Sequence, residues 1–309
     1  MADAIFDKLA IIGIGLLGSS IAHAVEAYGG AENVVLWDHD DYVRLQSERL
    51  IPGRVATSVE KAVSDADCVI LCTPVGTLAE LTETIAPNLK SGAILTDVGS
   101  VKAKAAGDME AACPAGVHLI PGHPIAGTEQ SGPEAGFSAL FQNAWHILTP
   151  LADTSPAYMD ATEKLTAFWS TLGARVETMD KDRHDRVLAI TSHLPHLIAY
   201  NIVSTAYDME SVEQGEVVKY SAGGFRDFTR IAASDPTMWR DVFLTNKDAV
   251  LETLGRFTED LAALQRAIRW GDGDMLMREF ERARGIRKAI IDAGLDTAEA
   301  DFGRRKDET

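Results

Sequence analysis

Short apolar runs alternate with helix-spaced segments from the N-terminus to about Met179. Apolar runs that end at Gly, Pro or Asp are typical of buried strands, and a 3.6-residue apolar period is typical of helices. This alternation predicts a parallel sheet covered by helices. We expect strands at Leu9–Ile12, Val34–Trp37, Cys68–Leu71, Ala93–Thr96 and Val117–Ile120. We expect helices at Ser19–Ala27, Asp41–Leu50, Thr77–Leu89 and Lys102–Ala112.

The pattern changes after Asp180, where strand signals give way to long helical periods. Before that point, strands at Trp145–Leu148 and Ala174–Thr178 flank a helix at Ser155–Leu172, and we expect them to extend the same sheet. The later helices are expected at Asp182–Met209, Trp239–Trp270 and Gly273–Ala293. We therefore predict a nucleotide-binding domain over 1–179 and an all-helical domain over 180–309.

A glycine motif stands between the first strand and the first helix. Gly13, Gly15 and Gly18, with Leu16 and Leu17 between the last two, form G-x-G-x-x-G in the strand–turn–helix context that dinucleotide binding requires. The second strand ends at Asp38, about twenty residues beyond the last Gly, where an acid binds the ribose of NAD. The motif predicts a Rossmann-type, doubly wound domain that binds NAD. The alternative for Asp38 is a turn residue at a strand end.

The stretch Gly122–Glu129 carries a His and a Glu after an α/β pattern, and it is too rich in Gly and Pro for a helix or a central strand. We expect a loop beyond a strand end, where parallel sheets bind ligands. Thr73–Pro74, Ser100 and His123 would then face the same crevice as the glycine motif. The alternatives are a surface turn for the loop and a helix cap for Ser100.

The formal net charge is −17, a field that repels nucleic acid and acidic membranes, so we expect neither as a partner. The three cysteines, Cys68, Cys72 and Cys113, are few and form no metal-like array, which suits a reducing cytoplasm. The N-terminus is not basic, no signal peptide is visible, and no uninterrupted apolar run reaches membrane-spanning length. We expect a cytoplasmic protein.

Two motifs stand out after Asp180. His193 and His196 lie three residues apart around Pro195, but no third ligand is suggested, so no metal site is predicted and His193 is expected to be buried for structural reasons. Gly223–Arg230 contains a Gly-Gly hinge, Arg226 and Arg230, with Lys219 and Arg240 nearby. In so acidic a chain this cluster predicts a site for a small anionic substrate, and the alternative is a set of solvated surface charges.

These motifs together resemble the prephenate dehydrogenase family, which includes arogenate and cyclohexadienyl dehydrogenases of tyrosine biosynthesis. The resemblance runs from about Leu9 to about Arg240. It implies a nucleotide-binding domain followed by a helical domain that forms a homodimer. It also implies the NAD-dependent oxidative decarboxylation of prephenate or arogenate. The glycine motif is common among dehydrogenases. The segments around His123, His196 and Arg230 are far more specific.

The resemblance also assigns roles. His123 resembles the catalytic histidine at the C4 hydroxyl, Ser100 the serine that hydrogen-bonds this histidine or the hydroxyl, and Arg230 the arginine that binds a substrate carboxylate. Trp37–Asp38 agrees with members that use NAD rather than NADP. The other residues that match the substrate pocket are Thr128, Glu129, His196, Asp227 and Trp239.

Two other functions stay open from the sequence. A β-hydroxyacid dehydrogenase would have a similar architecture, but it needs a catalytic Lys, which we do not find in Asp182–Met209. A non-catalytic NAD sensor would need the glycine motif but not the loop with His123. The sequence does not separate prephenate from arogenate.

Overall fold

The computed structural model describes residues 4–210 and 223–292 of the chain. The chain divides into two compact units. The first comprises Met1–Tyr200 with Ile231–Val250, and the second comprises Asn201–Arg230 with Leu251–Thr309. The boundary between residues 179 and 180 stays a prediction.

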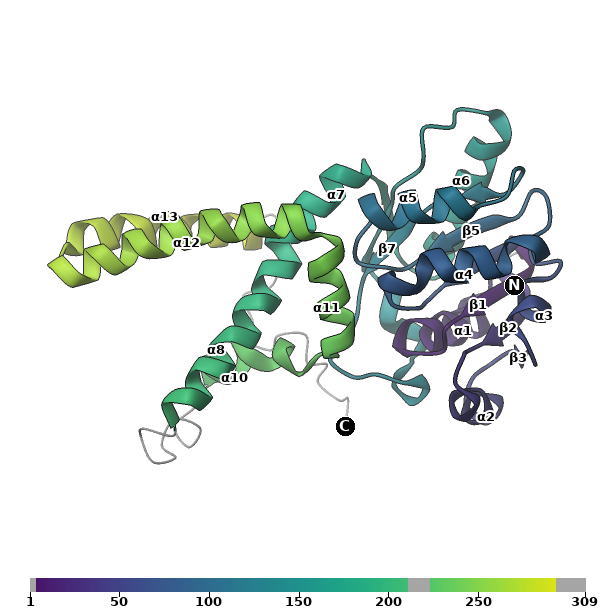
Figure 1. Ribbon diagram of the computed structural model, residues 1–309, viewed down its shortest axis with the longest axis horizontal. Coiled ribbons are helices and arrows are strands. Elements are labelled where there is room, and N and C mark those ends of the chain that lie inside the picture. The colour runs from purple at the N-terminus through teal and green to yellow at the C-terminus, as the bar shows by residue number, and fades with distance from the viewer. Residues whose placement is uncertain (1–3, 211–222, 293–309) are drawn as a thin grey trace. The chain divides into compact units, whose positions relative to one another are not determined.

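A six-stranded parallel sheet forms the centre of the first unit (Figure 1). Its order is β3-β2-β1-β4-β5-β6, the doubly wound Rossmann order, so the predicted fold class is confirmed. The strands are β1 (Phe6–Ile12), β2 (Ala31–Trp37), β3 (Arg54–Val55), β4 (Cys68–Leu71), β5 (Ile94–Asp97) and β6 (His118–Leu119). The helices between them are α1 (Leu16–Tyr28), α2 (Asp41–Leu50), α3 (Val59–Val63), α4 (Leu78–Ile85) and α5 (Ala103–Ala112).

Both faces of this sheet are buried, which is why its strands read as continuous apolar runs. In β1, Leu9 and Ile11 pack with α1 and α6 (Pro156–Thr171) in one core. Ala10 and Ile12 point the other way and pack with α3, α4 and α5 in a second core. The helix predicted at Thr77–Leu89 is α-helical only over α4, and 3₁₀ turns flank it at η1 (Val75–Thr77) and η2 (Ala86–Asn88).

The expectation that the last two strands extend the same sheet is wrong. They form a separate three-stranded sheet in the order β7-β8-β9, with β7 (Gly122–Ile125), β8 (Trp145–Leu148) and β9 (Arg175–Thr178). The expected loop at Gly122–Glu129 is therefore a strand in its first half. Pro124 is compatible with this strand because β7 lies at the edge of its sheet, where a missing N–H is tolerated.

The helical segments after Asp180 follow the predicted ranges, but their breaks lie elsewhere. Pro195 does not break its helix. A π-helical turn, η5 (Ala189–His193), joins α7 (Lys181–Leu188) to α8 (Leu194–Glu210) and shifts the hydrogen-bond register just before the proline. The remaining elements are α10 (Gly223–Thr229), η6 (Arg230–Ala233), α11 (Pro236–Thr245), α12 (Lys247–Trp270) and α13 (Gly273–Asp292).

Candidate active site

The three motif glycines have the geometry of a dinucleotide cradle. Gly13 has φ +99°, and a Cβ there would lie 2.6 Å from the Cys72 carbonyl oxygen. A Cβ at Gly18 would lie 2.0 Å from the Gly13 oxygen, so α1 packs directly on the turn. A Cβ at Gly15 would meet no described atom within 4 Å, which leaves the space that a pyrophosphate needs beside the N-terminus of α1. These residues fit NAD.

Asp38 lies at the carboxyl end of β2 and is largely buried. Its Oδ2 accepts a hydrogen bond from the Ile14 backbone N–H at 2.8 Å, and its Oδ1 accepts one from the Asp40 N–H at 3.0 Å. The carboxylate is thus fixed against the glycine turn rather than free in solvent. Thr73 lies on the other side of this turn, with its methyl carbon 3.1 Å from the position of a Cβ on Gly13, and Pro74 follows it.

His123 is buried on β7 and begins a chain of hydrogen bonds. Its Nδ1 lies 2.9 Å from Nε2 of His184, and Nδ1 of His184 lies 2.8 Å from Oδ1 of Asp185. His184 and Asp185 come from α7, which Asp180 caps by accepting from the Arg183 N–H. Two elements about sixty residues apart in sequence are therefore joined through side chains.

The direction of each bond in this chain follows from Asp185. A carboxylate only accepts, so His184 donates from Nδ1, and its neutral ring accepts at Nε2. His123 then donates from Nδ1, and its Nε2 keeps the lone pair. Burial lowers the pKa of His123 well below its usual 6.5, and His184 and Lys102 act in the same direction. His123 is thus a neutral base with its basic nitrogen defined.

Lys102 and Asp97 form a buried ion pair next to His123. The Lys102 ammonium also donates to the Gly122 carbonyl oxygen at 2.7 Å, and the Asp97 carboxylate accepts from the Gly99 N–H at 2.8 Å. Burial lowers the pKa of Lys102, and Asp97 opposes this shift. The pair ties the turn that carries Ser100 to the strand that carries His123.

Ser100 is not the cap of the following helix. The Asp185 carboxylate takes that place from α7, accepting from the Lys102 N–H at 2.8 Å and the Ala103 N–H at 2.9 Å. A carboxylate at a helix N-terminus is stabilised by the exposed N–H groups and the helix dipole. Asp185 therefore serves both α5 and His184, and the half-buried Ser100 has no capping role.

His196 and Trp239 meet within the first unit. Their rings stack with centroids 3.7 Å apart, and the His196 Nδ1 lies 2.9 Å from the Ser192 carbonyl oxygen. Trp239 is buried on α11, packed with Val101. Because Val101 follows Ser100 in the turn after β5, this stack lies beyond the carboxyl end of that strand.

The other predicted substrate residues lie on two further segments of the chain. Thr128 and Glu129 are exposed in the segment after β7. Asp227 and Arg230 belong to the second unit, and the Asp227 carboxylate lies 3.9 Å from the Arg226 guanidinium. Lys219 lies outside the described residues. The roles of these side chains stay predictions.

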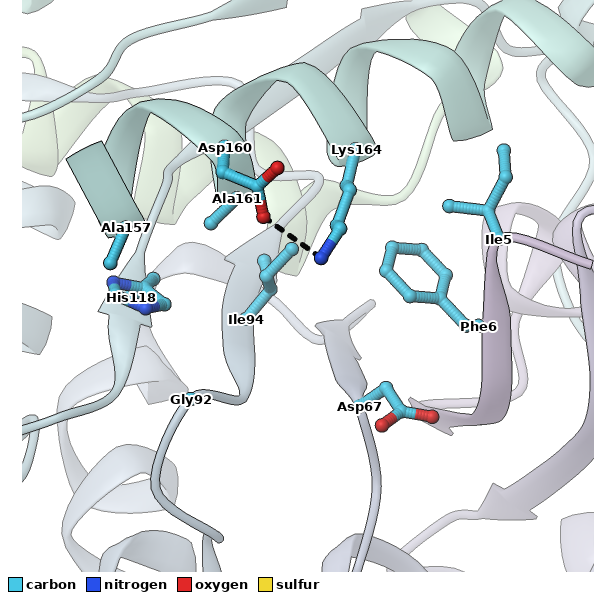
Figure 2. A pocket seen from close by; sticks show the side chains of 10 residues that line it. All are labelled: Ile5, Phe6, Asp67, Gly92, Ile94, His118, Ala157, Asp160, Ala161 and Lys164. Carbon is cyan, nitrogen blue, oxygen red and sulfur yellow. Dashed lines mark ion pairs between the residues drawn. The ribbon is translucent and has the colours of Figure 1, made fainter.

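A cavity of about 200 Å³ lies at the opposite, amino edge of the sheet (Figure 2). It is lined by the starts of β1 and β5, by His118 and by α6, and Asp160 and Lys164 at its rim form an ion pair at 2.8 Å. Ligands of doubly wound sheets bind at the carboxyl edge, so this cavity is not the active site. Among the described residues, no group of three or more His, Cys, Asp or Glu is arranged to hold a metal ion.

The sequence did not point to His184, Asp185 or Asn246. His184 and Asp185 read as the polar face of a helix start, and Asn246 reads as a residue inside one long helical period. The adjacent His-Asp pair just after the change in pattern was the one available signal. Lys102 was expected only as the first residue of a helix, and its burial was not foreseen.

Fold and site together define a dinucleotide-dependent oxidoreductase. The family model described as "Prephenate dehydrogenase, nucleotide-binding domain" matches residues 21–178, and "Prephenate dehydrogenase, dimerization domain" matches residues 180–282. The chain belongs to the prephenate dehydrogenase family, and its cofactor is NAD.

Individual relatives cover almost the whole chain. The cyclohexadienyl dehydrogenase of Zymomonas mobilis is 41% identical over 93% of this chain and 97% of its own length. The prephenate dehydrogenase of Bacillus subtilis is 33% identical over 92% of this chain and 76% of its own. The crystal structure of Aquifex aeolicus prephenate dehydrogenase with hydroxyphenyl propionate and NAD+ has a TM-score of 0.83 at 33% identity, covering 92% of this chain and 98% of that one.

Proposed function

We propose that this chain catalyses the NAD-dependent oxidative decarboxylation of prephenate to 4-hydroxyphenylpyruvate in tyrosine biosynthesis. The observation that carries the proposal is the buried chain from His123 through His184 to Asp185, in a member of this family. A base of defined tautomer beside a nucleotide cradle is what oxidation of a hydroxyl-bearing carbon requires.

His123 acts as the base in this proposal. Its Nε2 takes the proton of the C4 hydroxyl. NAD, when bound, would supply the acceptor for the hydride that leaves the same carbon. The bond between the ring and its carboxylate then breaks, CO2 is released and the ring becomes aromatic. The positive charge that develops on His123 is stabilised because its Nδ1–H donates to His184, which Asp185 orients in turn. Ser100 hydrogen-bonds His123 or the hydroxyl, and Arg230 binds a carboxylate of the substrate with its planar guanidinium.

Arogenate is the second candidate substrate, because a relative 41% identical to this chain is named a cyclohexadienyl dehydrogenase. The test is NADH formation, followed by absorbance, with prephenate and with arogenate in parallel. Turnover of either supports the reaction class, and the ratio of the two kcat/KM values assigns the preference. Formation of NADH with a β-hydroxyacid instead, or no formation of NADH with any of these substrates, contradicts the proposal.

We expect a strong preference for NAD over NADP, set by Asp38. A fixed carboxylate in a partly desolvated site repels the 2′-phosphate. Asp38→Ser should weaken NAD binding and raise the NADP-to-NAD ratio of kcat/KM by at least about tenfold, the effect of roughly 1.4 kcal/mol. Glu48→Ser, an exposed change of equal charge on α2, is the control. Equal use of both cofactors by the unaltered protein would exclude this role.

We expect Arg230 to bind substrate and not cofactor. Arg230→Ala should raise KM for the substrate at least about tenfold and leave NAD binding unchanged, because a lost charge-assisted partner costs about 2–5 kcal/mol when buried. Arg230→Lys should recover only part of the lost substrate affinity, since an ammonium cannot donate the two parallel hydrogen bonds that a guanidinium donates to a carboxylate. Arg256→Ala, an exposed cation on α12, is the control. Equal losses for prephenate and arogenate indicate the ring carboxylate, and an unchanged KM for both removes Arg230 from the site.

We expect a homodimer formed mainly by the helices after Asp180. The second unit exposes large apolar side chains on α8, α12 and α13, among them Trp270 at 74% and Phe280 at 57%. Faces of this kind are usually covered by a partner. Light scattering at micromolar concentration should give a dimer, Leu261→Glu with Phe280→Glu should shift it to monomer, and Leu45→Glu on α2 should not. A monomeric unaltered protein would refute the expectation.

Lys181–Met209 also has the length and mean hydropathy, 1.2, of a membrane-spanning helix. This segment buries three polar residues within the first unit, His184, Asp185 and His193. We therefore assign its exposed apolar residues to the proposed dimer interface. Cys68, Cys72 and Cys113 are free thiols, which supports the proposed cytoplasmic location.

A further inference from the structure

Asn246 is a buried amide between α11 and α12 that no substrate motif includes. Its Nδ2 lies 2.9 Å from the Asp185 carbonyl oxygen and 3.1 Å from Nδ1 of His193. A backbone carbonyl only accepts, so the atom facing it must be the amide nitrogen, and the orientation of the side chain is fixed. The second amide hydrogen is then directed to His193.

The tautomer of His193 follows from this contact. Its Nδ1 accepts from Asn246, so the ring proton resides on Nε2. His193 is fully buried, and its Nε2 has no hydrogen-bond partner of good geometry among the described residues, although the Ser100 backbone comes within reach of the ring. A buried donor without an acceptor is costly, and such groups in native proteins usually have a ligand or water as their partner.

The surroundings of His193 place this donor at the proposed site. Its ring is edge-on to Trp239 with centroids 6.0 Å apart, and a hydrogen-bond contact with the Ser100 backbone acts to raise its pKa. Trp239 Nε1 is a second buried donor without a partner among the residues that the structure describes. Burial lowers the pKa of His193 to about 4, against the opposing effect of Asp185. The ring is therefore neutral at the pH where His123 works.

We propose that Asn246 is a positioning residue that holds His193 in the Nε2–H tautomer, and that His193 donates this hydrogen bond to a substrate oxygen beside Ser100. The inference rests on the proposed function for the identity of the substrate. The proposal gives the two buried histidines different roles. His123 takes a proton, and His193 only donates a hydrogen bond.

The tautomer is measured first, in the full-length protein with ¹⁵N-labelled histidine. Nuclear magnetic resonance distinguishes protonated from unprotonated ring nitrogens, and His193→Gln assigns the signal among the 8 histidines. We expect a neutral Nε2–H ring between about pH 6 and 8, since a group with a lowered pKa stays neutral there. A proton on Nδ1, or a charged ring, overturns the proposal without any variant having to fold.

Binding is measured next, with hydroxyphenyl propionate as the probe in the presence of NAD. Asn246→Ala should mix the tautomers and weaken the probe about tenfold, the size expected for one hydrogen bond. Asn246→Asp should weaken it further, because a carboxylate draws the proton to Nδ1. His193→Gln should retain most of the affinity, since its amide nitrogen replaces the Nε2 donor, whereas His193→Ala should lose it. Asn201→Ala on the exposed surface of α8 is the control.

If an Asn246 variant shifts the tautomer of His193 but leaves the affinity for hydroxyphenyl propionate unchanged, the tautomer does not contribute to ligand binding. That result would overturn the proposal. Equal losses of probe affinity in His193→Gln and His193→Ala would also overturn it, because they would mean that His193 contributes only through packing. Absence of turnover with both prephenate and arogenate would contradict the proposed function separately, because neither measurement here depends on turnover.

Discussion

Replacing His123 with Asn should lower kcat by about 10²–10⁴-fold and leave the dissociation constant of NAD nearly unchanged. Asn keeps a donor near Nδ1, so the bond to His184 can persist, but it has no basic nitrogen in place of Nε2. The glycine turn and Asp38 lie on other elements, so the cofactor site is untouched. Steady-state kinetics with prephenate and NAD titration by fluorescence separate the two effects.

His118→Asn is the matched control, since His118 lies on β6 at the opposite edge of the sheet. The pH dependence of kcat gives a second test, because the direction of the change can be predicted. The neutral form of His123 is the active one, and burial lowers its pKa, so kcat should hold from pH 8 to about 6.5 and fall only at lower pH. A variant with more than half of the original turnover would remove His123 from the reaction.

Replacing Lys102 with Met should lower the free energy of unfolding by about 3–5 kcal/mol. The change leaves the fully buried Asp97 carboxylate without its counter-charge and the Gly122 carbonyl without its donor. Both partners are inaccessible to water, so solvent cannot replace what is lost. Urea unfolding of the full-length protein, followed by circular dichroism, measures the loss.

The control is Lys104→Met, two residues beyond Lys102, which removes an exposed ammonium paired with Asp108. Surface pairs of this kind contribute about 0–1 kcal/mol, so stability should hardly change. Asp97→Asn combined with Lys102→Met should recover part of the loss, because no unpaired charge remains. Equal stability of Lys102→Met and Lys104→Met would mean that the buried pair does not hold the site together.

The sheet could be predicted because its signal is local. Leu9–Ile12 ends at Gly13, and Val34–Trp37 ends at Asp38, so each strand and its ligand-facing end are read from a few adjacent residues. Pairing is not local. Trp145–Leu148 reads as a strand, but its antiparallel partnership with Gly122–Ile125 depends on contacts that no short window contains.

The residues of the candidate site also fall into two groups, those that a local sequence pattern marks and those that it does not. His123 could be singled out because Gly and Pro mark its segment, and Asp38 because its spacing from Gly18 is fixed by the fold. His184 and Asn246 could not, because their partners are 61 and 53 residues away and their own segments look like ordinary helices. Burial of a polar side chain is a property of the packed fold, and the linear pattern does not encode it.

The cap that Asp185 provides to α5 limits how the chain can be divided. A fragment that stops at Met179 keeps all nine strands of the two sheets and the whole glycine turn. It loses the carboxylate that holds the first turn of α5 and the ring that orients His123. A chimaera that exchanges helical parts between relatives should therefore be joined after Tyr200, where the first stretch of the compact unit ends, and not at the change in sequence pattern.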